Sequence, residues 1–134
     1  MTAFPFPFQG ERPVVTLTLK TPDPRLQDPP QRKVTLLADT GFSDYLQLDW
    51  ETFSGLGLEN HTLGTLTSGL ADGSTVIDLV AMVRVVIEEC AIDTYMRCLS
   101  NPAYGGDLLL AGSSFLSECR AVIDFPRRET ALSR

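Results

Sequence analysis

An aspartate, a threonine and a glycine follow one another at the end of an apolar run, and they are the residues best suited to chemistry. The run is Leu36-Leu37-Ala38, and Asp39-Thr40-Gly41 comes next. A strand that ends in a carboxylate can present it to water as a general base or acid. The glycine permits a sharp turn, and the threonine hydroxyl offers a supporting hydrogen bond. Taken alone, the tripeptide is also typical of a plain turn that ends a strand.

The other reactive side chains form no second candidate site. The single histidine, His61, lies in a polar stretch, and we interpret it as a surface residue. Cys90, Cys98 and Cys119 are an odd number of cysteines without the CxxC spacing of a metal site. We expect free thiols and a cytoplasmic location, because the cytoplasm keeps thiols reduced. One disulfide plus one free thiol is the alternative.

Alternating apolar and polar residues predict the strands that must position Asp39. Val14 to Lys20 alternates with a period of two, and a proline-rich loop joins it to a second strand that ends at Ala38. Asp72-Gly73 marks a tight hairpin turn before a long strand. The remaining elements are shorter. The predicted strands are 14–20, 33–38, 45–48, 62–70, 75–87, 90–99, 108–111 and 121–125, and the predicted helices are 49–58 and 113–119. Ser113 or Ser114 would cap the second helix.

These elements predict an all-β fold with one or two short helices, arranged as a small closed β-barrel. The 134 residues support a single domain, residues 1–134. A net charge of −6 and an isoelectric point near 4.6 argue against nucleic acid and against anionic membranes as partners. The sequence has no apolar stretch of the about 18 residues that a membrane span needs.

Four segments, in this order, resemble the retropepsin-like aspartic proteases of clan AA, and most nearly the small single-domain prokaryotic members. They are the segment with the catalytic aspartate, the flap hairpin, a hydrophobic pair and glycine before a short helix, and the closing strand. In this chain they are Asp39–Leu46, Gly69–Ser74, Leu110–Leu116 and Val122–Phe125. The resemblance covers most of the chain and implies a closed retropepsin-like barrel, one lobe per chain.

The resemblance implies that Asp39 is the acid/base of an aspartic endopeptidase that works as a homodimer. Because the chain has one such motif, Asp39 of a second copy would supply the other carboxylate, and the pair would activate a water to hydrolyse a peptide bond. Thr40 would brace the two loops across the two-fold axis, and Gly41 would let the backbone approach the carboxylates. Such a dyad needs no metal and no cofactor.

The same resemblance assigns the polypeptide substrate to the flap and to the residue after Gly41. The implied substrate-binding residues are Phe42, Leu70, Ala71, Asp72, Gly73 and Ser74. Leu110, Ala111 and Gly112 would pack behind the catalytic loop. Two other interpretations stay open: a non-catalytic barrel of this kind used for dimerisation or peptide binding, and an unrelated barrel in which Asp39 ends a turn.

The two ends of the chain flank the barrel. Residues 1–12 form an N-terminal arm with three phenylalanines, which either docks across a partner or lies on its own barrel. Residues 126–134 are polar and follow Pro126, and we expect a flexible tail there.

Overall fold

The computed structural model describes residues 3–69, 71–103 and 108–134. It is mostly β with two short helices, as the sequence predicts, and it also has two single turns of 3-10 helix, which the sequence analysis did not predict. The strands are β1 (Phe4–Pro7), β2 (Val14–Lys20), β3 (Gln31–Ala38), β4 (Leu46–Gln47), β5 (Thr62–Gly69), β6 (Thr75–Ile87), β7 (Ile92–Ser100), β8 (Leu110–Ala111), β9 (Val122–Asp124) and β10 (Glu129–Leu132). The helices are α1 (Trp50–Gly55) and α2 (Ser113–Glu118), and the 3-10 turns are η1 (Leu58–His61) and η2 (Glu88–Cys90).

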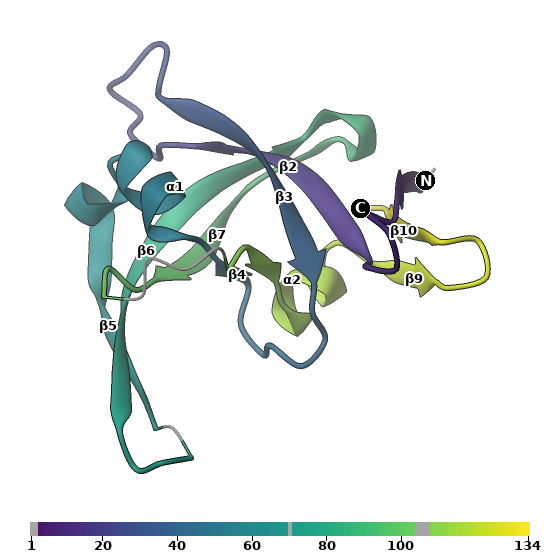
Figure 1. The fold of residues 1–134 in the computed structure, drawn as a ribbon. Helices are drawn as coiled ribbons and strands as arrows, with labels where there is room; N and C mark the ends of the chain where they lie inside the picture. The colour runs from purple at the N-terminus through teal and green to yellow at the C-terminus, as the bar shows by residue number, and fades with distance from the viewer. Residues whose placement is uncertain (1–2, 70, 104–107) are drawn as a thin grey trace.

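Six strands close into a barrel (Figure 1). Their order is β2-β3-β8-β4-β7-β6, and β6 pairs back onto β2 to complete the ring. The alternation in β2 places Val15, Leu17 and Leu19 inside, where each is almost fully buried. The chain therefore forms a small closed β-barrel, as the sequence predicts.

The predicted proline-rich loop joins β2 and β3 into a hairpin, which determines where Asp39 lies. The two strands are antiparallel, with Val14 opposite Leu37 and Lys20 opposite Gln31. Thr21, at the start of the connecting loop, donates a hydrogen bond from its hydroxyl to the carbonyl of Leu56, 2.6 Å away. The proline-rich loop projects beyond the barrel (Figure 1). After the loop, β3 returns along the barrel wall and ends at Ala38, one residue before Asp39.

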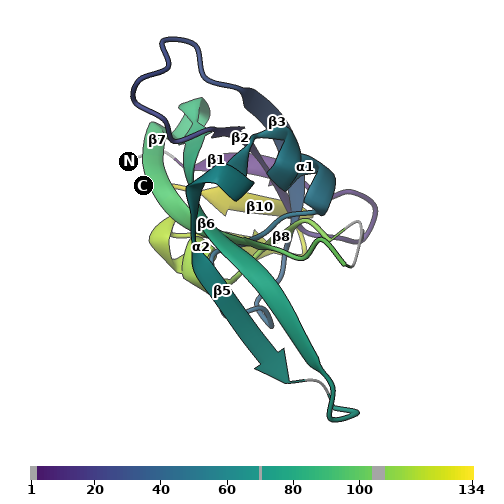
Figure 2. The same ribbon diagram turned by 90° about the vertical axis from the view of Figure 1, so that its left-hand side faces the viewer.

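The long strand β6 serves both the barrel and a projecting hairpin. Its first half pairs with β5 and its second half with β2, while β7 pairs along most of its length. Figures 1 and 2 show the β5–β6 hairpin extending well away from the barrel. At its tip Gly73 has φ +86°, a conformation that glycine adopts without a Cβ clash.

A second sheet joins the two ends of the chain, in the order β1-β10-β9. The prediction of a flexible tail at residues 126–134 is wrong for 129–132, which form the central strand of this sheet with Thr130 and Leu132 fully buried. The alternation of buried and less buried residues in Glu129–Leu132 covers only four residues and follows the polar residues Arg127 and Arg128, so the sequence analysis missed this strand. The pairing partner, β1, lies at the other end of the sequence.

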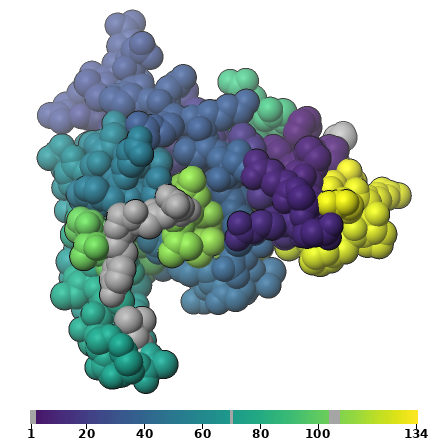
Figure 3. All heavy atoms as spheres, in the orientation of Figure 1, coloured from purple at the N-terminus to yellow at the C-terminus, as the bar shows by residue number. Residues whose placement is uncertain are grey.

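The N-terminal arm lies on its own chain. Phe4 to Pro7 pair with Leu132 to Glu129, and the side chain of Phe6 is buried in the core. Figure 3 shows the N-terminal residues packed beside the C-terminal ones at one end of the molecule. The sequence left open whether the arm docks across a partner or lies on its own barrel, and in the structure it packs on its own chain. In the described part of the chain, no helix is long and apolar enough to cross a membrane.

Candidate active site

Asp39 lies where β3 leaves the barrel beside β8. The two strands are parallel, with Leu37 opposite Leu110 and Ala38 opposite Ala111. The amide of Asp39 donates to the carbonyl of Ala111 across 2.9 Å, which continues this pairing by one residue. The backbone that carries the half-buried carboxylate is therefore held by the barrel wall.

The residues after Asp39 form a tight turn around its carboxylate. Gly41 donates its amide to Asp39 Oδ1 at 2.9 Å, and Phe42 donates its amide to the Asp39 carbonyl at 3.2 Å. Gly41 does not have a positive φ. A small residue is favoured here for another reason, since a Cβ at this position would lie 3.2 Å from Asp39 Oδ1. The glycine thus lets the backbone approach the carboxylate.

The start of α2 holds the far side of this turn, which we call the 39–45 loop. Gly112 donates its amide to the Tyr45 carbonyl at 2.8 Å, and Ser113 donates its amide to the Phe42 carbonyl at 2.7 Å. A Cβ on Gly112 would lie 2.6 Å from the Phe42 oxygen and closer still to a second backbone oxygen, that of Asp44. The loop and the helix therefore fit together only because residue 112 has no side chain.

The helix cap differs from the sequence prediction. Gly112 is the N-cap of α2, and no side chain caps the helix. Ser114 instead donates its hydroxyl to the Ser43 carbonyl at 2.7 Å. The Ser114 hydroxyl therefore holds the 39–45 loop and does not cap the helix.

An ion pair ties the same loop to β7. Arg97 Nη2 lies 2.9 Å from Asp44 Oδ2, and the other Asp44 oxygen accepts the amide of Tyr45 at 2.8 Å. Arg97 is half exposed, while the carboxylate is mostly covered. Both oxygens of Asp44 are therefore used to position the loop.

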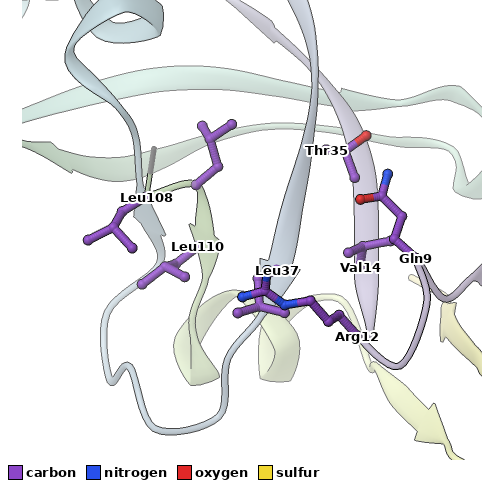
Figure 4. Close-up of a pocket in the computed structure, with 8 residues that line it drawn as sticks. Gln9, Arg12, Val14, Thr35, Leu37, Leu108 and Leu110 are labelled. Carbon is purple, nitrogen blue, oxygen red and sulfur yellow. The ribbon is translucent and has the colours of Figure 1, made fainter. Parts of the chain in front are cut away.

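A pocket of about 220 Å³ opens beside β3 and β8 (Figure 4). Leu37 and Leu110, opposite one another in the sheet, both line it. Leu37 lies two positions before Asp39, so the pocket is close in sequence to the carboxylate, although Asp39 does not itself line it. Its full lining is Gln9, Arg12, Val14, Thr35, Leu37, Leu108, Leu109 and Leu110. Its lining is mixed, with leucine side chains on one side and the polar side chains of Gln9, Arg12 and Thr35 on the other.

The structure brings only some of the sequence-predicted residues to this place. Asp39, Thr40 and Gly41 lie together in the loop, and Thr40 is exposed without a hydrogen bond to another described residue. Phe42 is half buried, with its ring against Gly112 behind the loop. Ala111 and Gly112 pack behind the loop as expected from the sequence, whereas Leu110 lines the pocket.

The predicted flap residues form the tip of the β5–β6 hairpin. Ala71, Asp72, Gly73 and Ser74 are all exposed, and Leu70 lies outside the described residues. In Figure 1 this tip stands apart from the 39–45 loop. Asp72 Oδ1 accepts the Ser74 amide at 2.9 Å and its hydroxyl at 2.5 Å. The hydroxyl hydrogen bond lowers the pKa of the Asp72 carboxyl, so the tip carries a negative charge at neutral pH.

Several residues at this place were missed by the sequence reasoning. The ion pair of Arg97 with Asp44 joins positions 53 residues apart, and no pattern in the chain signals it. Leu37 had a usable signal, because it alternates with the buried Leu36 and Ala38 at the end of the strand that leads to Asp39. Arg12 and Leu108 reach the pocket from separate loops, which only the folded chain brings together.

Comparison with known proteins places the fold. No known family profile matches the sequence, and no curated protein matches it significantly. The structure is similar to the crystal structure of a retropepsin-like aspartic protease from Rickettsia conorii, with a TM-score of 0.58. The two share 19% sequence identity, and the match covers 98% of this chain and 95% of that one. The chain thus has the retropepsin-like fold, as its motif order indicated.

Proposed function

We propose that this chain is one half of an aspartic endopeptidase, and that two copies bring Asp39 and its symmetry mate together as the catalytic dyad. The observation that carries the proposal is the place of Asp39. It follows a barrel strand, its amide donates to the Ala111 carbonyl, and Leu37, two positions before it, lines a pocket together with Leu110. A chain of this fold with one such carboxylate needs a second copy, and a two-fold axis is the commonest way to supply it.

In the proposed mechanism the two carboxylates share one proton. Two like charges a few ångströms apart do not both ionise readily, so one carboxyl stays protonated. The ionised Asp39 takes a proton from a water molecule as that water attacks the peptide carbonyl carbon. The protonated partner gives its proton to the carbonyl oxygen, which forms a tetrahedral diol. As the C–N bond breaks, Asp39 gives the proton that it took from water to the departing nitrogen, and the partner carboxylate takes a proton back from a diol hydroxyl, so that an amine and a carboxylic acid leave and the dyad is restored. Thr40, exposed and without a partner of its own in the described chain, braces the two loops.

The proposed substrate is a polypeptide with a large apolar side chain near the cleaved bond. That side chain enters the pocket between Leu37, Leu108 and Leu110. The hairpin tip at Ala71–Ser74 covers the bound chain and keeps water out, which strengthens the electrostatic interactions of the dyad. A cytoplasmic location remains a prediction from the cysteines alone.

The test is cleavage of an unfolded protein substrate by the purified protein between about pH 4 and pH 7, where a shared-proton dyad is active. Asp39→Asn keeps the shape of the side chain but removes its acid/base function, and we expect no cleavage from it. The matched control is Asp28→Asn in the exposed proline-rich loop, which changes the same group far from the site and should cleave like the original protein.

The concentration dependence tests the second copy. Below the dissociation constant of a homodimer, the rate rises with the square of the protein concentration. Cleavage that is equal in the original protein and in Asp39→Asn would contradict the proposal. If both are inert, binding of unfolded peptides to Asp39→Asn decides for the alternative, a peptide-binding barrel without catalysis.

A further inference from the structure

The β5–β6 hairpin leaves the barrel at the point where a third strand stops. Leu79 on β6 lies opposite Ser100, the last residue of β7. From Asp78 toward the tip, β6 pairs with β5 alone, and the two strands project from the barrel (Figure 2). We call this point, at Asp78, the hairpin root. Since a two-stranded hairpin is only marginally stable by itself, the contacts at the root determine how firmly it is held.

Packing does little to set the direction of this hairpin. Of the eight residues of β5 only Leu66 is partly buried, and it lies opposite Asp78. The strand also has a bulge between Thr62 and Gly64, and Gly64 has φ +145°, a conformation that other residues rarely adopt. Because a bulge interrupts regular pairing, β5 does not by itself fix the hairpin against the barrel.

Asn101 supplies a hydrogen bond at the hairpin root. It directly follows β7, so continuing the register of the two strands places it beside Asp78, and it is only 8% exposed. Its Oδ1 accepts the Ala103 amide at 2.8 Å, which fixes the orientation of the side chain. The other end of that side chain, Nδ2, is therefore the donor in the hydrogen bond between Asn101 and the Asp78 carboxylate.

This hydrogen bond is the polar contact that holds Asp78 in place. In residues 3–69, 71–103 and 108–134, no arginine, lysine or histidine forms an ion pair with Asp78. Burial raises the pKa of the Asp78 carboxyl, and the Asn101 hydrogen bond offsets this only in part. A partly buried carboxylate without a cation depends on the hydrogen bonds that it accepts, so the position of Asp78 depends on Asn101.

We propose that Asp78 and Asn101 are positioning residues, whose hydrogen bond sets the direction of the β5–β6 hairpin and so the closure of its tip over a polypeptide substrate. The closure over a substrate rests on the proposed function. A strand rises ~3.3 Å per residue, so the tip at Gly73 lies on the order of 15 Å from Asp78, and a rotation of about 10° at the root moves the tip by roughly 3 Å. Such a displacement removes the tip from the chain that it should cover.

Asn101→Asp tests the hydrogen bond with little change in side-chain shape. The new carboxylate still accepts the Ala103 amide, but it has no N–H to donate and it faces Asp78 with a like charge. Native-state hydrogen exchange of the whole chain measures the effect on the hairpin. We expect the protected amides of residues 65–67 and 76–78 to exchange at least about tenfold faster, with unchanged rates in β2 and β3.

An exchanged pair supplies the rescue. In the double variant Asp78→Asn, Asn101→Asp the donor and the carboxylate change places, so the hydrogen bond can form again, and we expect exchange rates within about twofold of the original. Asn60→Asp is the matched control, because it adds the same charge to an exposed residue of η1. Unchanged hairpin rates in Asn101→Asp, or an exchanged pair that is no better than the single variant, would overturn the inference.

Kinetics separate positioning from a general loss of structure. A hairpin that closes less often lowers the apparent affinity for substrate in proportion to the competent fraction of the protein. We expect KM of Asn101→Asp for an unfolded polypeptide to rise about tenfold and kcat to stay within about twofold, because Asp39 and its loop are unchanged. The exchanged pair should restore KM. A fall in kcat with the original KM would contradict a positioning role.

Failure of this inference and failure of the proposed function are distinguishable, because hydrogen exchange needs no cleavage. A hairpin that Asn101→Asp loosens and the exchanged pair restores, in a protein that cleaves nothing, supports the positioning hydrogen bond and contradicts the protease. Cleavage with the same KM in Asn101→Asp and in the original protein supports the protease and contradicts the inference.

Discussion

Arg97 on β7 and Asp44 in the 39–45 loop form an ion pair, with Nη2 and Oδ2 2.9 Å apart. The pair crosses from the barrel wall to the loop that carries Asp39. The Asp44 side chain is only 16% exposed, so water screens its interaction with Arg97 less than it screens a pair on the open surface. We infer that Arg97 is a positioning residue for Asp39.

Arg97→Met should lower kcat of the proposed protease with little change in KM, because the loop loses one of its anchors while the pocket is unchanged. We expect a stability loss of about 1 kcal/mol, as for a partly exposed charged hydrogen bond. The matched control is Arg84→Met, which removes a similar pair with Asp93, 2.7 Å long and away from the loop. Equal losses of kcat in the two variants would contradict a positioning role.

Gly112→Ala should destabilise the fold and displace the 39–45 loop. The added methyl group would meet the carbonyl oxygens of Phe42 and Asp44, which are backbone atoms and cannot rotate away. We expect a loss of about 3 kcal/mol in urea unfolding, in the upper range for overpacking. Gly69→Ala is the control, because a Cβ there has no atom within 4 Å. A Gly112→Ala protein as stable as Gly69→Ala would show that the loop moves freely.

Leu110→Ala should reduce cleavage selectively after large apolar residues. The substitution widens the pocket that Leu37 and Leu110 line, so contacts with a leucine or phenylalanine side chain are lost. We expect kcat/KM to fall about tenfold for such peptides and less for an alanine analogue. Leu26→Ala on the exposed loop serves as the control. The same loss for both peptides would mean that the pocket does not select the substrate.

The three cysteines should resist alkylation in the folded protein. Burial raises the pKa of Cys98 and of Cys119 to about 12, and it also raises the pKa of Cys90. Because the thiolate is the reactive form, iodoacetamide at pH 8 should modify none of them until the chain is unfolded. Mass spectrometry before and after guanidinium treatment measures this. Fast labelling of one thiol in the native protein would show local opening around it.

The same thiols make stability fall in alkali. In the unfolded chain they ionise near their usual pKa of 9.0, whereas Cys98 and Cys119 in the fold ionise only near 12. The unfolded state thus releases protons first, and stability decreases as pH rises between these values. Thermal unfolding from pH 8 to pH 10 should show the decrease, and Cys98→Ala should make it shallower. An unchanged slope in Cys98→Ala would contradict this origin.

Local residue patterns were enough to predict many of the barrel strands. The alternation in Thr75–Ile87 predicted a strand with the bounds that β6 has, and α1 lies within the predicted helix 49–58. Of the two caps that the sequence allows for this helix, Asp49 and Thr52, the structure has Asp49, whose carboxylate accepts the Thr52 amide. These elements succeed because their signals lie within a few neighbouring residues. The prediction of a flexible tail was wrong because β10 is stabilised by pairing with β1, more than a hundred residues away in the sequence, and not by its own sequence pattern.

The sequence by itself determined that this chain is β-rich, acidic and one lobe in size, and that Asp39 ends an apolar strand before a threonine and a glycine. Only the tertiary structure decided what surrounds that carboxylate. Arg97 forms an ion pair with Asp44, Gly112 donates a hydrogen bond to the 39–45 loop, and Leu37 and Leu110 line the same pocket. These contacts form because strands that are distant in sequence pair in one barrel. Such contacts depend on closing long loops, and short-range residue patterns carry no record of which distant partners meet.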